Sequence, residues 1–127
     1  EFRTLKETYN KYDYFFIHVK GTDTAGEDGN FDAKVKVIEQ FDRALPQVLS
    51  LNPDVTVVTG DHSTPTLFKG HSWHPVPFLI HSKRCRPDGV KKFGERACTT
   101  GSLGRFPAKQ TMLLAMAHAV KMTKYGP

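Results

Sequence analysis

Three groups of acidic and histidine side chains along the chain could hold metal ions. They are the adjacent pair Asp61 and His62, the pair Asp23 and Glu27 four residues apart, and His71. Carboxylate oxygens and imidazole nitrogens together suit Mn²⁺ or Zn²⁺ better than Ca²⁺. Taken alone, the Asp61–His62 pair fits a metal site, a catalytic dyad or a turn. The other three residues favour the metal site.

The remaining histidines and one lysine have less specific surroundings. His74 stands beside a tryptophan and a proline, where an imidazole is expected to pack or to form a hydrogen bond. His81 and His118 are expected at structural or surface positions. His18, at the end of an apolar run, and Lys20, two residues later, are candidate functional residues, Lys20 as a contact for a phosphate group.

Short apolar runs and one helical pattern would position these side chains. Strands are predicted at residues 14–19, 55–59 and 75–80, because these runs are short, apolar and rich in β-branched or aromatic residues. A helix is predicted at residues 31–50, where apolar side chains recur at spacings of three and four. The polar, glycine-rich residues 20–29 are predicted to form a loop.

The helix at residues 31–50 carries a start signal and an internal break. Asn30 is a suitable N-cap, and Asp32 suits the first turn. Pro46 lacks an amide hydrogen and clashes with the preceding turn, so the helix should kink or restart near Ala44.

Two further helical segments are predicted at the ends of the chain. Residues 1–12 are interpreted as the end of a helix, and residues 81–105 as mostly loop. A final helix should begin near Pro107. Lys121 and Lys124 would complement its last turn, and Gly126 would end it.

The order strand, helix, strand predicts a right-handed crossover unit and parallel strands. Loops that follow parallel strands lie at one edge of the sheet, where α/β proteins bind ligands. Ligands from three connections would then converge, as a two-metal site requires. We therefore predict one set of ligands from Asp23, Glu27 and His71, and the start of a second set from Asp61 and His62.

Composition and charge limit other functions. The 127 residues are 39% hydrophobic and 24% charged, as in an ordinary globular domain. No apolar run approaches the roughly 18 residues that span a bilayer, and no signal-peptide pattern is seen. The net charge of +5 comes largely from residues 83–96, predicting a solvated loop or a rim facing a phosphorylated ligand. No motif or aromatic platform indicates nucleic-acid binding.

Two cysteines, Cys85 and Cys98, are too few for a disulfide scaffold or a cysteine-based zinc site. Free thiols in a reducing cytosol are expected. The first residue is Glu1 rather than Met, which suggests a trimmed chain or a fragment.

Three stretches resemble the archaeal-type 2,3-bisphosphoglycerate-independent phosphoglycerate mutases of the alkaline phosphatase superfamily. They are HVKGTDTAGEDG at residues 18–29, TGDHSTP with HSWHPVP between residues 59 and 77, and GSLGR at residues 101–105. The resemblance covers residues 12–127. It implies an α/β fold with three layers, α/β/α, and a mostly parallel sheet. Residues 1–127 would be the C-terminal portion of a metal-dependent phosphoryl-transfer domain.

The resemblance also implies a reaction and its cofactors. Phosphoglycerate would be interconverted between its 3- and 2-phosphorylated forms in glycolysis and gluconeogenesis, in the cytoplasm, through a phosphoserine intermediate. Two divalent metal ions are implied, usually Mn²⁺, with Zn²⁺ or Mg²⁺ as alternatives. The metal ligands of the family correspond to Asp23, Glu27, His71, Asp61 and His62. Substrate or phosphate contacts would come from His18, Lys20 and Arg105.

The sequence departs from the family in two ways. Histidine is the family residue at the position of Glu27, so we expect an altered metal site rather than a lost one. The nucleophilic serine of the family is absent, and three strands are too few for the full sheet. We therefore expect the chain to need its N-terminal portion and to be inactive alone. The alternatives are a phosphohydrolase of the same superfamily and a non-catalytic binding domain that keeps the fold.

Overall fold

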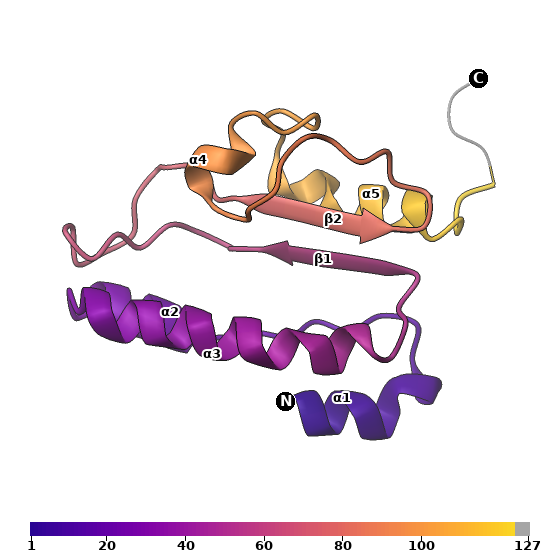
Figure 1. Ribbon diagram of the computed structural model, residues 1–127, viewed down its shortest axis with the longest axis horizontal. Coiled ribbons are helices and arrows are strands. Elements are labelled where there is room, and N and C mark those ends of the chain that lie inside the picture. The colour runs from indigo at the N-terminus through magenta and orange to yellow at the C-terminus, as the bar shows by residue number, and fades with distance from the viewer. Residues whose placement is uncertain (124–127) are drawn as a thin grey trace. The chain divides into compact units, whose positions relative to one another are not determined.

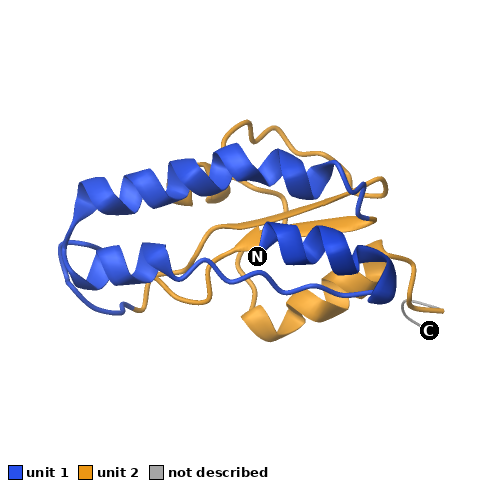
Figure 2. Ribbon diagram, turned by 90° about the horizontal axis from the view of Figure 1, so that it is seen from below, with its two compact units in different colours: residues 1–53, 64–72 blue, residues 54–63, 73–127 orange. Residues whose placement is uncertain are grey.

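The computed structural model describes residues 1–123, which form two compact units (Figure 2). Unit 1 contains residues 1–53 and 64–72. Unit 2 contains residues 54–63 and, of the described chain, residues 73–123. The predictions for Lys124 and Gly126 lie outside the described residues.

Unit 1 is helical (Figure 1). Its elements are α1 (Phe2–Thr8), the short 3-10 helix η1 (Tyr9–Lys11), α2 (Gly21–Glu27) and α3 (Phe31–Leu49). Both α1 and α2 pack against α3. Phe2 of α1 meets Phe41 of α3 with ring centroids 6.3 Å apart. The expected helix in residues 1–12 is therefore present.

Helix α3 confirms the predicted helix at residues 31–50. Asn30 is its N-cap, and the Asn30 side chain accepts a hydrogen bond from the backbone N–H of Ala33 at 2.9 Å. The predicted restart near Ala44 is wrong, because α3 continues through Pro46 to Leu49. Pro46 stands only one turn before the end, and its carbonyl still accepts the closing bond from Ser50 N–H at 2.9 Å.

The loop predicted for residues 20–29 is wrong, because residues 21–27 form helix α2. Its glycines allow close packing. A β-carbon at Gly21 would lie 3.2 Å from Val37 of α3, and one at Gly26 would lie 2.4 Å from the backbone oxygen of Thr64. Asp23 in the first turn is favoured by the positive end of the helix dipole. Tertiary contacts thus outweigh the weak helix propensity of glycine.

The strand predicted for residues 14–19 is not formed among the described residues. Burial alternates along it: Phe15, Ile17 and Val19 are half-buried, whereas Phe16 and His18 are exposed. This alternation is typical of extended backbone. A strand also needs a neighbour to share its hydrogen bonds, and the described chain supplies none here.

Unit 2 is built on a two-stranded sheet. Strand β1 (Val55–Thr59) lies where it was predicted, whereas β2 (Phe78–Ser82) begins after Pro75 and Pro77 instead of at residue 75. These prolines lack the amide hydrogens that a ladder requires. In the register, Val55 faces Ser82 and Thr59 faces Phe78.

The two strands are antiparallel. The parallel pair expected from the crossover unit was residues 14–19 with residues 55–59, and the strand at 14–19 is not formed in the described chain. Residues 60–77 contain no helix. Parallel neighbours need a crossover, usually through a helix, so a return without one gives an antiparallel pair. The described residues therefore show a small antiparallel sheet and helices.

Three short helices follow β2 in unit 2. They are α4 (Glu95–Cys98), the 3-10 helix η2 (Ala108–Gln110) and α5 (Thr111–His118). Helix α5 packs against β1. Pro107 precedes the final helical region in an extended conformation, as its predicted position at the start requires.

Helix α5 ends earlier than predicted. Val120 adopts a left-handed conformation with φ of 58°, and Lys121 N–H bonds back to the Met116 carbonyl at 2.9 Å. This pattern is a Schellman-type C-terminus, which glycine usually supplies. The left-handed Val120 therefore ends the helix before Gly126, where the sequence predicted the end.

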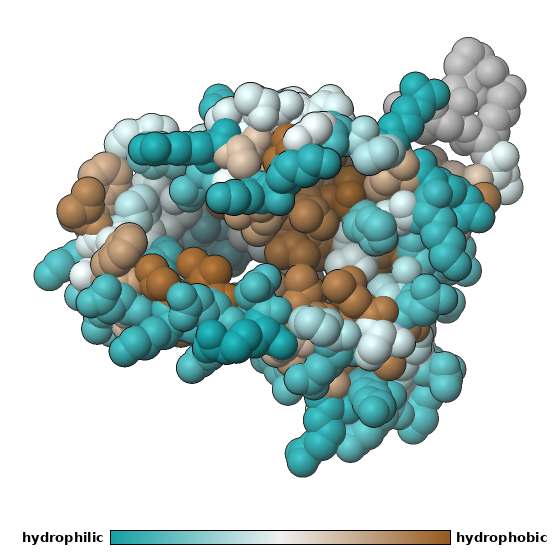
Figure 3. All heavy atoms as spheres, viewed as in Figure 1, coloured by the Kyte–Doolittle hydropathy of each residue, from teal (hydrophilic) through white to brown (hydrophobic). Residues whose placement is uncertain are grey.

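Few side chains are deeply buried in the described structure. Leu5 and Ala25 are its buried hydrophobic residues, and none of the described side chains is less than 2% exposed. The accessible surface is 10050 Å². A compact protein of 14.3 kDa would expose about 6,800 Å². Figure 3 shows apolar surface open to solvent on the face viewed.

Within the described residues, every helix is too short or too polar to cross a membrane.

Candidate metal centre

Helix α2 presents two carboxylates on one face. Asp23 and Glu27 are four residues apart, and side chains at this spacing are neighbours on a helix surface. The Asp23 side chain is 11% exposed, whereas that of Glu27 is 51% exposed. Because the segment is helical rather than a loop, the spacing of the two carboxylates is fixed by the helix itself.

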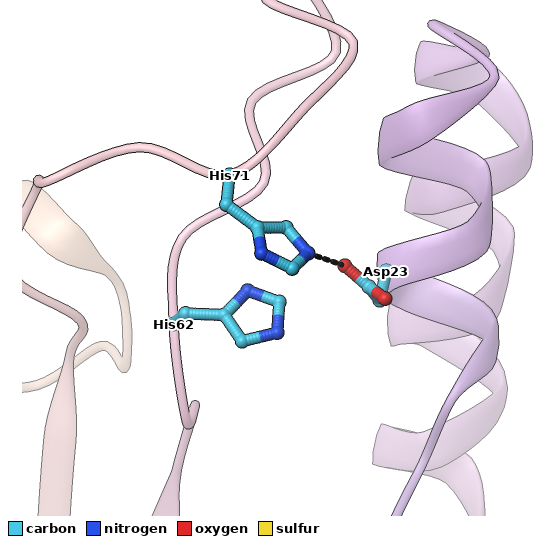
Figure 4. Close-up of side chains that lie close together, drawn as sticks. All are labelled: Asp23, His62 and His71. Atoms are coloured by element: carbon cyan, nitrogen blue, oxygen red, sulfur yellow. Dashed lines mark ion pairs between the residues drawn. The ribbon is translucent and has the colours of Figure 1, made fainter.

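His71 lies against both carboxylates within unit 1. Its Nε2 is 3.4 Å from Asp23 Oδ1, the contact dashed in Figure 4, and 3.8 Å from Glu27 Oε1. Two donors about 2.0–2.2 Å from one ion lie roughly 3.0–3.5 Å apart. The Asp23–His71 spacing fits a shared divalent ion, and the Glu27 contact is slightly wider. The structure thus brings together one predicted set of ligands, and its oxygen and nitrogen donors suit Mn²⁺ or Zn²⁺.

Both oxygens of Asp23 have partners. The hydroxyl of Thr64 donates a hydrogen bond to Asp23 Oδ1 at 2.7 Å. The ammonium group of Lys20 donates to Asp23 Oδ2. Hydrogen bonds of this kind fix the orientation of a carboxylate before a metal binds.

Thr64 is itself held in place and is only 4% exposed. The Lys34 ammonium of α3 donates to the Thr64 carbonyl at 2.6 Å. The same carbonyl lies so close to Gly26 that a β-carbon there would approach it to 2.4 Å. Sequence reasoning assigned no role to Thr64 or Lys34. The only available signal for Thr64 was its position two residues after His62.

Asp61 and His62 belong to unit 2 and follow β1 after Gly60. The backbone N–H of His62 donates to Asp61 Oδ1 at 3.1 Å. His62 Nε2 lies 3.5 Å from Asp61 Oδ2. The His62 side chain is 31% exposed and that of Asp61 is 67% exposed. The pair therefore combines an imidazole and an accessible carboxylate in one short segment.

The predicted substrate contacts lie at exposed positions. His18 and Lys20 precede α2 in unit 1 and border a hollow of about 380 Å³. The hollow is also lined by Phe2, Val37 and Phe41 of α1 and α3. Arg105 is exposed in unit 2, before η2. Their contacts with a substrate remain predictions.

His74 stacks on Trp73, with ring centroids 5.1 Å apart and an interplanar angle of 20°. This packing agrees with the role expected for His74. His81 is exposed on β2, and His118 is half-buried at the end of α5.

The chain is similar to enzymes and to a solved structure. A probable 2,3-bisphosphoglycerate-independent phosphoglycerate mutase from Thermosipho africanus (strain TCF52B) is 56% identical over 126 residues, which are 99% of this chain and 31% of that protein. The probable mutase of the same name from Aquifex aeolicus (strain VF5) is 55% identical with the same coverage. The chain thus spans 31% of the length of these curated relatives.

The solved structure of the PH0037 protein from Pyrococcus horikoshii is 36% identical and matches with a TM-score of 0.93. It covers 99% of this chain and 39% of that protein. The sequence model of the Metalloenzyme superfamily matches residues 1–118. The chain therefore belongs to the Metalloenzyme superfamily.

Proposed function

We propose that this chain is the metal-binding C-terminal portion of a cofactor-independent phosphoglycerate mutase, which interconverts 3-phosphoglycerate and 2-phosphoglycerate. The contact of His71 with Asp23 and Glu27 carries this proposal, because it gathers three donors suited to a divalent ion. The names of relatives about 55% identical over nearly the whole chain support the reaction.

The rest of the protein would complete the fold and the site. Its N-terminal portion would supply further strands, giving a three-layer arrangement with a mostly parallel sheet. The exposed apolar surface supports this part of the proposal, since such surface is normally covered. The same portion would supply the nucleophilic serine and the remaining ligands. By itself, residues 1–127 would be inactive.

Different residues of this chain would bind the two metal ions. Asp23, Glu27 and His71 would hold one divalent ion, usually Mn²⁺, with Zn²⁺ or Mg²⁺ as alternatives. Asp61 and His62 would contribute to a second. When bound, the two ions would stabilise the negative charge that develops on a transferring phosphoryl group. Thr64 keeps Asp23 Oδ1 oriented throughout.

Basic side chains would hold the substrate during transfer. Lys20 and Arg105 would contact the phosphate oxygens, and His18 would contact the glycerate part. The serine of the N-terminal portion would take the phosphoryl group from one hydroxyl of glycerate and return it to the other. This two-step exchange explains why no bisphosphorylated cofactor is needed. The reaction belongs to glycolysis and gluconeogenesis in the cytoplasm.

The full-length protein, stripped of metal and reloaded with Mn²⁺, tests the proposal. It should convert 3-phosphoglycerate to 2-phosphoglycerate and should hydrolyse a generic phosphomonoester poorly. The Asp61→Asn variant should lose both activity and bound metal. Rapid hydrolysis with no isomerisation would make the protein a phosphohydrolase. Substoichiometric metal that is unchanged in Asp61→Asn would indicate a non-catalytic binding protein.

A further inference from the structure

A second group of reactive side chains lies within unit 2, far along the chain from the candidate metal ligands. Cys85 follows β2, and His118 ends α5. Cys85 Sγ lies 3.6 Å from His118 Nδ1, and the hydroxyl of Ser82 lies 3.2 Å from the same nitrogen. Ser82 Oγ also lies 3.5 Å from Cys85 Sγ. A thiol, a hydroxyl and an imidazole therefore meet at one point.

The turn after β2 fixes this arrangement. Ser82 is only 6% exposed, and its hydroxyl oxygen accepts a hydrogen bond from Arg84 N–H at 3.1 Å. The Cys85 backbone N–H bonds to the Ser82 carbonyl at 3.2 Å. Cys85 Sγ also lies 3.6 Å from the carbonyl oxygen of Ile80. The thiol is thus positioned from β2, while its imidazole partner comes from α5.

The surroundings suit a sulfur nucleophile. A thiolate, not a thiol, attacks electrophiles, and a nearby cation or base favours it. His118 ends α5 and brings its Nδ1 to 3.6 Å from Cys85 Sγ, within reach of the thiol proton. The exposed side chains of Lys83, Arg84 and Arg86 add positive charge next to Cys85 in the sequence. Cys85 is half-buried, so part of the residue is open to solvent.

We propose that Cys85 is a modification site that forms mixed disulfides with small anionic disulfides, with His118 as the base. The thiol proton moves from Sγ to His118 Nδ1 as Sγ attacks one sulfur of the disulfide. A new sulfur–sulfur bond forms on Cys85, and the bond within the reagent breaks. The departing sulfur takes the proton from His118. One disulfide replaces another, so no separate oxidant is needed.

Cys98 is a matched control within the same chain. It is also a free, half-buried cysteine, at the end of α4. Within the described residues its thiol forms no hydrogen bond of the kind that links Cys85 and His118. Trypsin separates the two thiols, because cleavage after Arg84 and Lys91 releases one peptide and cleavage after Arg96 and Arg105 releases the other. Arg86 precedes a proline and is not cut.

The test measures the modification rate of both cysteines in the intact protein. The reagent is dithiobis(nitrobenzoate), an aromatic disulfide with two carboxylates, and hydroxyethyl disulfide is the neutral comparison. After acid quenching, the tryptic peptides are quantified by mass spectrometry. Cys85 should react about 10-fold or more faster than Cys98 with the anionic reagent. The advantage should shrink with the neutral reagent, and with that reagent it should disappear in urea-unfolded protein.

The His118→Asn variant separates proton transfer from hydrogen bonding, since an amide can bond to the thiol but cannot take its proton. Its Cys85 rate should fall about 10-fold or more, with the Cys98 rate unchanged. Equal rates at the two cysteines in the folded wild-type protein would overturn the proposal, and so would an unchanged Cys85 rate in a folded His118→Asn variant. If that variant unfolds, both rates will match the urea reference, and the wild-type comparison then decides.

Discussion

The Thr64 hydroxyl donates a hydrogen bond to Asp23 Oδ1 at 2.7 Å, joining residues 41 positions apart in the chain. The same oxygen of Asp23 lies 3.4 Å from His71 Nε2. Thr64, together with Lys20 on the other oxygen, therefore orients the carboxylate proposed to meet a metal ion. Its own carbonyl is tied to Lys34 of α3, so the helix, the threonine and the carboxylate form one connected set.

Replacing Thr64 by valine should weaken metal binding about 10- to 100-fold, because Asp23 loses the hydrogen bond that orients its Oδ1. Thr64→Ser keeps the hydroxyl and should retain most of the affinity. Isothermal titration of the metal-free, full-length protein with Mn²⁺ measures both. Equal affinity for the valine and serine variants would show that the hydroxyl plays no part. Thermal unfolding of each variant controls for lost structure.

Gly26→Ala should displace residues 64–72, since the new β-carbon would lie 2.4 Å from the Thr64 backbone oxygen. Backbone cannot yield as a flexible side chain can, so both stability and metal affinity should fall. Alanine is the better helix former, and on propensity alone it would stabilise α2 by about 1 kcal/mol. Thermal unfolding distinguishes the two effects. A lower melting temperature would show that the clash with the Thr64 backbone outweighs the gain in helix propensity, and a higher one would show the reverse. Gly89→Ala is the control, because a β-carbon there meets nothing within 4 Å.

Glu27 should influence which metal binds. Its carboxylate lies 3.8 Å from His71 Nε2 and is half-exposed, so it has room to adjust. Glu27→Gln removes the charge and should lower affinity for Mn²⁺. Glu27→His supplies a nitrogen donor and should shift the preference toward Zn²⁺. Competition between the two metals, read by elemental analysis after dialysis, measures the preference. Identical metal ratios in wild-type and Glu27→His proteins would exclude Glu27 as a ligand.

Asp88 should titrate at unusually low pH. The backbone N–H of Ser102 and that of Val90 each donate to its carboxylate at 3.0 Å, and these bonds lower the pKa of Asp88 below 3.8. Because the folded pKa is depressed, the stabilisation is complete above the ordinary pKa and is lost as the pH falls through the folded pKa.

Nuclear magnetic resonance can follow this titration through the amide signal of Ser102. The signal should shift with a midpoint below 3.8, the ordinary value for the carboxyl group. Asp88→Asn should remove the transition while leaving the signal of Thr100, outside the carboxylate bonds, largely unchanged. A midpoint at or above the ordinary value would contradict the hydrogen bonds seen here.

Val120→Gly should stabilise the chain by about 1 kcal/mol. A β-branched residue with φ of 58° is strained, and glycine adopts this conformation freely. Val120 is 56% exposed, so little packing is lost. Chemical denaturation of the full-length protein measures the gain. Val120→Ala keeps a β-carbon and should gain less, and a destabilised glycine variant would show that the valine side chain contributes more than its strain costs.

Local patterns predicted local elements well. Helix α3 agrees with its prediction to within one residue because its apolar spacing and the Asn30 cap act within a few residues. Strand β1 was likewise located correctly. The strand prediction for residues 14–19 failed for a non-local reason. Apolar composition favours an extended chain, but a strand also needs a neighbouring strand to share its hydrogen bonds. Helix α2 was missed because Gly21 and Gly26 looked like loop residues, when their role is close contact with Val37 and Thr64.

In the candidate site, too, the sequence predicted some residues and missed others. The spacing of Asp23 and Glu27 and the position of His71 were enough to predict that they meet, although through a helix rather than a loop. Thr64 and Lys34 were not predicted as supporting groups. A threonine hydroxyl and a lysine ammonium have many partners available in any fold, and only the path of residues 64–72 past α2 selects Asp23 and the Thr64 carbonyl.

The scarcity of buried side chains has a thermodynamic consequence. Unfolding raises the heat capacity in proportion to the apolar surface it newly exposes, at roughly 12–15 cal/mol/K per residue in ordinary domains. With Leu5 and Ala25 as the buried hydrophobic residues of the described chain, much of that surface is already hydrated before unfolding. Melting of residues 1–127 alone would therefore have a small heat-capacity step, a weak dependence on denaturant and a broad transition.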